Sequence, residues 1–261
     1  MHMETNPELQ GNPEPEKNNP KTASEVGHAR NVANLQKLIL QVSVYSLYNP
    51  PVPELTVASL QTLYNTATAK INEVEDKRNA NKNAIALRQE AFENLKATCT
   101  RIVNRLEILG LPQGTIDQAK SLNRSIQGTT KKSVKTTETG KEAPKTISSS
   151  RQSFTQKADN FGVLLQLLTT ISAYAPQEDE LKLTSLNTYK SELVSATQAV
   201  DQTEAELNLK LIERDKILYT EGTGLYSIAL NVKKYMKSLY GGTSPEYLTV
   251  SGIKFTVVSN Q

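Results

Sequence analysis

A short corner sequence occurs twice in this chain, and each copy comes directly before a long apolar heptad pattern. The first copy, YNPPVPEL, spans residues 48–55, and the second, YAPQEDEL, spans residues 174–181. They lie 126 residues apart, and this offset holds without a gap from about residue 34 to residue 109, with scattered identical residues between 34 and 102. Since 126 is a multiple of seven, both copies keep the same heptad phase. We interpret the chain as a tandem duplication.

The patterns around each corner predict helices. Before the first corner, residues 35–45 place apolar side chains three and four residues apart, and Pro50 must end this helix because the residue before a proline avoids the helical region. Residues 54–109 hold apolar heptads with no Pro or Gly, which predicts one very long helix. Thr115 and Gln118 resemble a capping box, so a short helix is predicted from residue 116 to 126.

The second copy predicts the same elements with one difference. Gly222 and Gly224 fall inside its long heptad pattern, and each glycine costs about 1 kcal/mol relative to alanine inside a helix, so we expect a break there. Ser244 followed by Pro245 is a good start for a short last helix. The fold class we predict is all-α: an elongated antiparallel helical bundle resembling a coiled coil, with a helix, a very long helix and a short helix in each copy.

Composition divides the chain into four segments. Residues 1–29 hold prolines among polar residues and are predicted to be a disordered tail. Residues 30–127 form repeat 1, residues 128–150 are a flexible linker rich in Thr, Ser and Lys, and residues 151–261 form repeat 2. We expect the two repeats to pack as one elongated domain, because a single repeat would leave half of its long helix without a partner.

The titratable residues argue against most catalytic chemistry. Histidine occurs only as His2 and His28, both assigned to the tail, so the predicted helical body lacks a His-based metal site or nucleophile pair. The single cysteine, Cys99, lies at an apolar heptad position and is predicted to be packed in the core. We therefore expect no enzyme activity, no cofactor and no metal.

Charged and polar side chains interrupt the middle of both apolar seams. Buried polar residues at such positions usually set register and partner choice, so they are predicted to form a mutually bonded network. The alternative is a hydrated, widened middle that binds a ligand. The residues are Arg78, Asn81, Arg88, Glu204, Arg214 and Glu221.

Four tyrosines fall one residue after an apolar position of the second long pattern. Side chains that face outward there would provide anchors for a partner, whereas a third helix would bury them in the core. Both alternatives stay open from the sequence. The tyrosines are Tyr219, Tyr226, Tyr240 and Tyr247.

These features favour a non-enzymatic helical scaffold or protein-interaction protein whose partner is a protein, either a second copy or another chain. A membrane-acting protein, which would resemble α-pore-forming toxins in its very long helices, is the alternative, and a carboxylate enzyme is a third hypothesis. A net charge of +3 does not argue for nucleic acid, and none is expected. The sequence shows neither a signal peptide nor an apolar run of the length of a membrane span, so we expect a soluble cytoplasmic protein.

Overall fold

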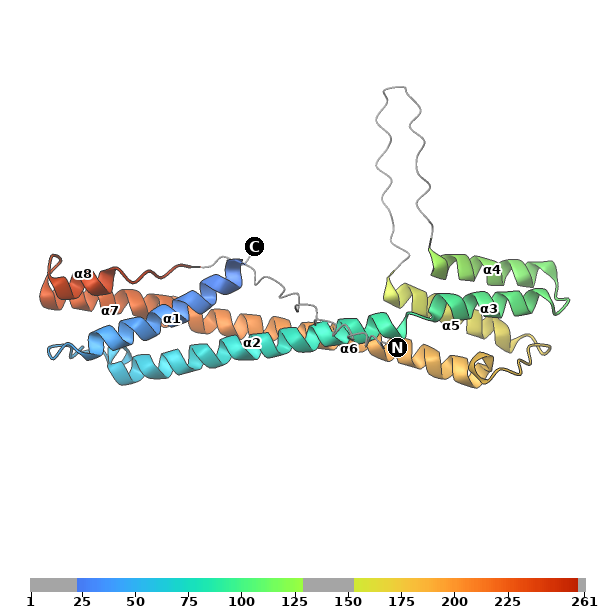
Figure 1. Ribbon diagram of the computed structural model, residues 1–261, viewed down its shortest axis with the longest axis horizontal. Coiled ribbons are helices and arrows are strands. Elements are labelled where there is room, and N and C mark those ends of the chain that lie inside the picture. The colour runs from blue at the N-terminus through green and yellow to red at the C-terminus, as the bar shows by residue number, and fades with distance from the viewer. Residues whose placement is uncertain (1–22, 129–152, 258–261) are drawn as a thin grey trace, which may run out of the picture. The chain divides into compact units, whose positions relative to one another are not determined.

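The regular structure of the chain is helical throughout the residues that the computed structural model describes, 23–128 and 153–257 (Figure 1). The all-α prediction is therefore confirmed, and no strand forms in these ranges. Two 3-10 helices, η1 (Pro53–Leu55) and η2 (Asp179–Leu181), occupy the two corners. The α-helices are α1 (Ala23–Ser43), α2 (Val57–Ala91), α3 (Leu95–Glu107), α4 (Gln113–Gln127), α5 (Phe154–Thr169), α6 (Leu183–Tyr219), α7 (Leu225–Tyr240) and α8 (Pro245–Ser251).

The described chain forms two compact units. Unit 1 holds residues 23–71 and 214–257, and unit 2 holds residues 72–128 and 153–213. Each unit therefore combines segments from both predicted repeats, which the sequence boundaries did not suggest. The duplication itself stays a hypothesis. The predicted tail up to residue 22 and the predicted linker from residue 129 lie outside the described residues.

Unit 1 has its core where α1 packs against α7 and α8 (Figure 1). Apolar residues of α1 recur at spacings of three and four, so they share one face of the helix, and this face is buried against α7 and α8. From α7, Leu225, Ile228, Ala229 and Val232 are buried on the opposite side of the same core. The buried residues of α1 in this core are Val32, Leu35, Leu38, Ile39 and Val42.

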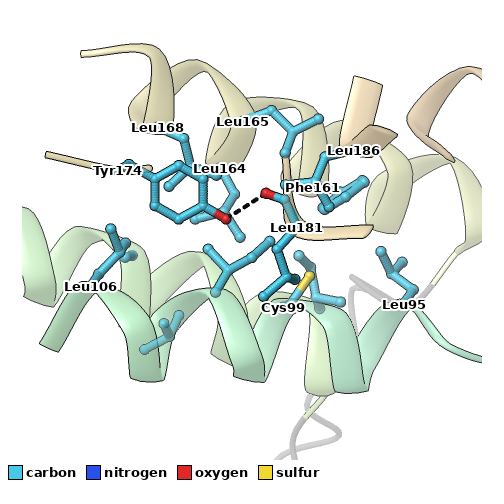
Figure 2. Close-up of a cluster of buried hydrophobic side chains, with 14 of the residues drawn as sticks. Leu95, Cys99, Leu106, Phe161, Leu164, Leu165, Leu168, Tyr174, Leu181 and Leu186 are labelled. Carbon is cyan, nitrogen blue, oxygen red and sulfur yellow. Dashed lines mark hydrogen bonds between the residues drawn. The ribbon is translucent and has the colours of Figure 1, made fainter. Parts of the chain in front are cut away.

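Unit 2 has a separate core, in which α4 packs against both α3 and α5. Figure 2 shows Leu95, Cys99 and Leu106 of α3 opposite Phe161, Leu164 and Leu168 of α5. Cys99 is fully buried among them, and burial raises the pKa of its thiol to about 12. The core position predicted for Cys99 is confirmed.

Both corners close through the same hydrogen bond. The hydroxyl of Tyr48 donates to the carbonyl of Leu55 at 2.6 Å, and the hydroxyl of Tyr174 donates to the carbonyl of Leu181 at 2.9 Å (Figure 2). Each bond joins residues seven positions apart, so it spans the proline-containing turn. Because the two leucine side chains are buried, each corner is tied to the core of its own unit.

The long pattern of repeat 1 does not form one helix. It is divided at residues 92–94 into α2 and α3, although no Pro or Gly marks the site. The break follows from packing: Phe92 and Leu95 are both buried, and the Phe92 ring meets the Phe154 ring edge-on at a centroid distance of 4.8 Å. Tertiary contacts here outweigh helix propensity. In repeat 2, the break predicted at Gly222 and Gly224 is confirmed, since α6 ends at Tyr219 and α7 begins at Leu225.

Glycine is required at the second of these positions. A Cβ on Gly224 would lie 2.6 Å from the backbone nitrogen of Thr220, a distance that real Cβ atoms do not adopt. The backbone N–H of Gly224 also donates to the carbonyl of Thr220 at 2.7 Å. The close return of the chain between α6 and α7 thus explains the glycine in the heptad pattern.

Two predicted helix starts are wrong, and a third is confirmed. Helix α1 begins at Ala23 rather than after residue 29, because its buried face extends back to His28. Helix α4 begins at Gln113, and the carbonyl of Pro112, not a Thr115 capping box, accepts from the first-turn amides. Helix α8 begins as predicted, with the Ser244 hydroxyl accepting from an N–H of the first turn.

We expect Cys99 to be unreactive in the folded chain. The thiolate is the reacting species, and both its raised pKa and its burial oppose attack on a disulfide reagent. Titration with 5,5'-dithiobis(2-nitrobenzoate) at pH 7.5 should show no reaction in the native protein and one equivalent after unfolding in guanidinium. Rapid reaction of one equivalent in the native state would contradict the buried position.

Removing the corner hydroxyl of unit 2 should destabilise the protein. Tyr174→Phe leaves the carbonyl of Leu181 without its donor, which should cost about 1–3 kcal/mol of unfolding free energy. Urea unfolding followed by circular dichroism measures the change. Tyr226→Phe is the matched control, because the Tyr226 hydroxyl has no hydrogen-bond partner within the described ranges, and it should stay within about 0.5 kcal/mol of wild type. Equal losses in the two variants would argue against the corner bond.

Candidate interaction surface

The corner of unit 1 is held by tyrosines. Besides the bond from Tyr48 to Leu55, the hydroxyl of Tyr235 on α7 donates to the carbonyl of Asn49 at 2.7 Å. The rings of Tyr48 and Tyr235 meet edge-on, with centroids 5.5 Å apart and an interplanar angle of 73°. Burial, and then the neighbouring Tyr235, raise the pKa of the Tyr48 hydroxyl above its ordinary value. This loop is therefore held to α7 just before its prolines, and the bond from Tyr48 to Leu55 closes it across them.

The corner of unit 2 is held by ion pairs instead. Arg101 lies 2.6 Å from Glu180, and Arg105 lies 2.6 Å from Glu178, so two residues of α3 pair with the corner. A hydrogen bond from its own backbone, together with the Arg105 guanidinium, holds the pKa of the Glu178 carboxyl below its usual range. Both pairs are partly exposed, so each stabilises the corner only modestly.

Exposed apolar side chains are concentrated in the sequence around the corner of unit 1. Four of them lie on the last turn of α1 and in the loop after it, and we call these four the corner patch. The exposed fractions are 59% for Leu40, 72% for Val44, 63% for Leu47 and 45% for Val52. Exposed apolar side chains are common singly, but several on one short segment point to a contact surface.

The matching surface of unit 2 is polar. The residues 126 positions further along the chain are Gln166, Thr170, Ala173 and Glu178, and all four are exposed. The same backbone arrangement therefore carries apolar side chains in one unit and hydrophilic or small ones in the other. Since both sets are exposed, the difference does not arise from core packing.

The predicted polar network is not assembled as expected. Glu204 is exposed, because α6 turns Thr203 toward α2, where the Thr203 hydroxyl donates to the Asn81 side-chain carbonyl at 3.0 Å. Glu221 is also exposed and lies between α6 and α7, where heptad phase no longer applies. Two of the predicted carboxylates are therefore not buried partners of the guanidiniums.

The three arginines of the predicted network contact residues outside it. The Nε of Arg78 lies 3.7 Å from a carboxylate oxygen of Glu75 one turn away. The guanidinium of Arg88 stacks on the Phe154 ring, 4.3 Å from its centroid. Arg214 is almost fully buried and donates from Nε and Nη2 to one Asp215 oxygen at 2.9 and 2.8 Å. The heptad pattern located these arginines without identifying these contacts.

Three of the four predicted surface tyrosines lie against the core of unit 1. Tyr219, Tyr240 and Tyr247 are half-buried and pack on its apolar cluster. The Tyr240 ring meets the Tyr45 ring at a centroid distance of 5.7 Å. Tyr226 is half-buried as well, but is not part of that cluster. The first three are thus placed as the packing alternative requires.

A buried polar cluster joins α1 to the end of α6, and it was not predicted from the sequence. His28 is fully buried, and its Nδ1 lies 2.8 Å from the Tyr219 hydroxyl. Asn31 is also buried and donates to the same hydroxyl at 3.2 Å. The helical spacing of His28, Val32 and Leu35 was the available signal, since it continues the buried face of α1 backwards.

The segment after α8 is held to the helices by side chains. Asn31 donates to the carbonyl of Thr256 at 2.6 Å and accepts from its N–H at 3.1 Å, as a neighbouring strand would. Asn34 donates to the carbonyl of Lys254 at 2.6 Å. Lys233 on α7 donates to the carbonyl of Ile253 and lies over the Phe255 ring. Burial, followed by the nearby charge of Lys254, lowers the pKa of the Lys233 amine.

No protein-family model, curated protein or solved structure matches the chain. Among the described residues, no group of His, Cys, Asp and Glu side chains is arranged to hold a metal ion. None of the described helices combines the length and the apolar character that a membrane crossing requires.

The hydrogen bonds that hold residues 253–257 against the helices lead to a specific prediction for hydrogen exchange. Asn31→Ala removes the acceptor of the Thr256 N–H, so the protection of this amide should fall about tenfold or more. Asn34→Ala is the matched control, because it removes a bond to a carbonyl and leaves the Thr256 N–H paired. Amide exchange followed by NMR measures both. Unchanged exchange of the Thr256 amide in Asn31→Ala would contradict this hydrogen bond.

Proposed function

We propose that this chain is a non-enzymatic helical scaffold that binds a protein partner through the corner patch of unit 1. The single observation that carries the proposal is the contrast between matching corners: Leu40, Val44 and Leu47 are exposed where the other unit has Gln166, Thr170 and Ala173. Exposed apolar surface costs free energy in water, at about 25 cal/mol per Å². A partner that covers it recovers that free energy.

The hydrogen bonds that hold the loop after α1 favour binding of a partner at the corner patch. Tyr48 and Tyr235 hold the loop after α1 by hydrogen bonds to Leu55 and Asn49, so the patch is presented on a fixed backbone. A contact surface that is already ordered loses less conformational entropy on binding. Binding residues on a loop that a rigid framework positions are a common arrangement in proteins.

The chemistry of the patch favours an apolar protein surface over nucleic acid. Binding to phosphate groups depends on cationic side chains, and the four members of the patch are aliphatic. Four side chains are also far fewer than the roughly 20–30 residues a side of a stable interface. We therefore propose a transient contact with apolar side chains of another protein.

The test exchanges the patch for its polar counterpart. The triple variant Leu40→Gln, Val44→Thr and Leu47→Ala carries the residues of the matching corner and should keep the circular dichroism spectrum, because all three positions are exposed. Quantitative mass spectrometry of proteins retained from an extract of the source cells should show a partner at least tenfold depleted with the variant.

The control changes apolar side chains of similar exposure elsewhere. Leu87→Gln, Leu209→Gln and Ile212→Gln together should retain the partner as wild type does. Equal retention by the wild type and both triple variants would overturn the proposal. Leakage from dye-loaded vesicles that depends on the corner patch would instead favour the membrane-acting alternative.

A further inference from the structure

A cleft opens in unit 1 beside η1. Its volume is about 440 Å³, and Glu54 of η1 lines it together with residues of α2, α7 and the end of α6. Leu63, Ile217 and Ile228 form an apolar wall, and Thr62 and other hydroxyl residues line the remainder. Glu54 is exposed, and within residues 23–128 and 153–257 its carboxylate takes part in no ion pair. The cleft thus combines one free anion with an apolar wall.

Unit 2 has a cleft beside η2 that shares two lining positions with this one at the offset of 126, Glu180 for Glu54 and Ala97 for Thr223, and there the chain provides a cation. This second cleft is smaller, about 270 Å³, and it is lined by Glu180, which lies 126 residues after Glu54. Arg101 of α3 also lines it, and its Nη1 lies 2.6 Å from the Glu180 carboxylate. The anion of unit 2 is therefore neutralised by a guanidinium of the same unit.

The register of α7 shows which residue of unit 1 takes the place of Arg101. The buried residues Cys99 and Ile102 of α3 match the buried residues Leu225 and Ile228 of α7 at the same offset of 126. Position 101 therefore corresponds to Ser227, whose short side chain accepts from the N–H of Gly222 at 3.2 Å. Unit 1 therefore has the carboxylate but carries no cation at the matching position.

We propose that the cleft of unit 1 is a binding site for an arginine side chain of a partner polypeptide. The guanidinium would pair with Glu54, and the aliphatic stem would lie against Leu63, Ile217 and Ile228. Arginine side chains bury their stems on apolar surface while the charged end stays near water, which fits a cleft with this wall and an exposed carboxylate. A planar guanidinium also pairs with a carboxylate through two parallel hydrogen bonds, which an ammonium group does not.

This site is separate from the corner patch and shares none of its residues. The inference therefore goes beyond the proposed function and does not depend on it. It adds the chemical class of a ligand, a polypeptide segment with an arginine beside apolar side chains, to a cleft that the sequence did not predict.

The test compares two short peptides that differ only in charge. Acetyl-Leu-Arg-Leu-amide and its neutral analogue, with citrulline in place of arginine, are titrated into the full chain with labelled Ile and Leu methyl groups. The arginine peptide should shift the methyl signals of Leu63, Ile217 and Ile228 in a saturable way. The citrulline peptide should bind at least tenfold more weakly. No shifts at these methyl groups, or equal binding of the two peptides, would overturn the proposal.

Three variants locate the site. Glu54→Gln removes the anion and should weaken binding of the arginine peptide at least tenfold, whereas Glu180→Gln, the matched change in unit 2, should leave it unchanged. Ser227→Arg places a guanidinium where unit 2 has one, so it should pair with Glu54 and block the peptide. Wild-type binding by Glu54→Gln or by Ser227→Arg, each checked for folding by circular dichroism, would overturn the assignment to this cleft.

Discussion

The hydrogen bond from a corner tyrosine to a leucine carbonyl is the contact on which both units depend. Helices α1 and α5 end at Ser43 and Thr169, proline keeps each corner out of the helical region, and the backbone must then enter a new helix near the core. A buried carbonyl without a donor would destabilise that turn, and the hydroxyls of Tyr48 and Tyr174 provide the donors. Each bond also fixes a buried leucine, Leu55 or Leu181, just before the first turn of a long helix.

The two corners share this bond and differ in almost everything around it. In unit 1 the neighbouring contacts are made by an aromatic residue, because Tyr235 of α7 donates a hydrogen bond to the loop. In unit 2, Arg101 and Arg105 pair with carboxylates instead. Because the shared bond maintains the backbone, the exposed residues are free to differ without loss of the fold. The asymmetry leaves unit 1 with exposed aliphatic side chains and with Glu54, which forms no ion pair with any residue that the structure describes, and both proposals rest on that difference.

The polar residues inside the fold follow tertiary contacts rather than heptad positions. The Asn31 side chain forms hydrogen bonds with both the carbonyl and the N–H of Thr256, in the segment after α8. His28 forms a hydrogen bond with Tyr219, which is distant in the sequence. The partners in these contacts are about 190 to 225 residues apart in sequence. Local periodicity carries no information on such pairs, which is why His28 was predicted to lie in a tail.

The sequence by itself determined the helical class, both corners, the break at Gly222 and Gly224 and the start of α8 at Pro245. These features depend on local rules, namely side-chain periodicity, the backbone limits of proline and glycine, and capping. Only the tertiary structure decided the break at residues 92–94 and the exposure of Glu204. A heptad position states which face of a helix a residue lies on. Which neighbour covers that face depends on contacts between distant segments, and these decide whether a side chain is buried, paired or left to solvent.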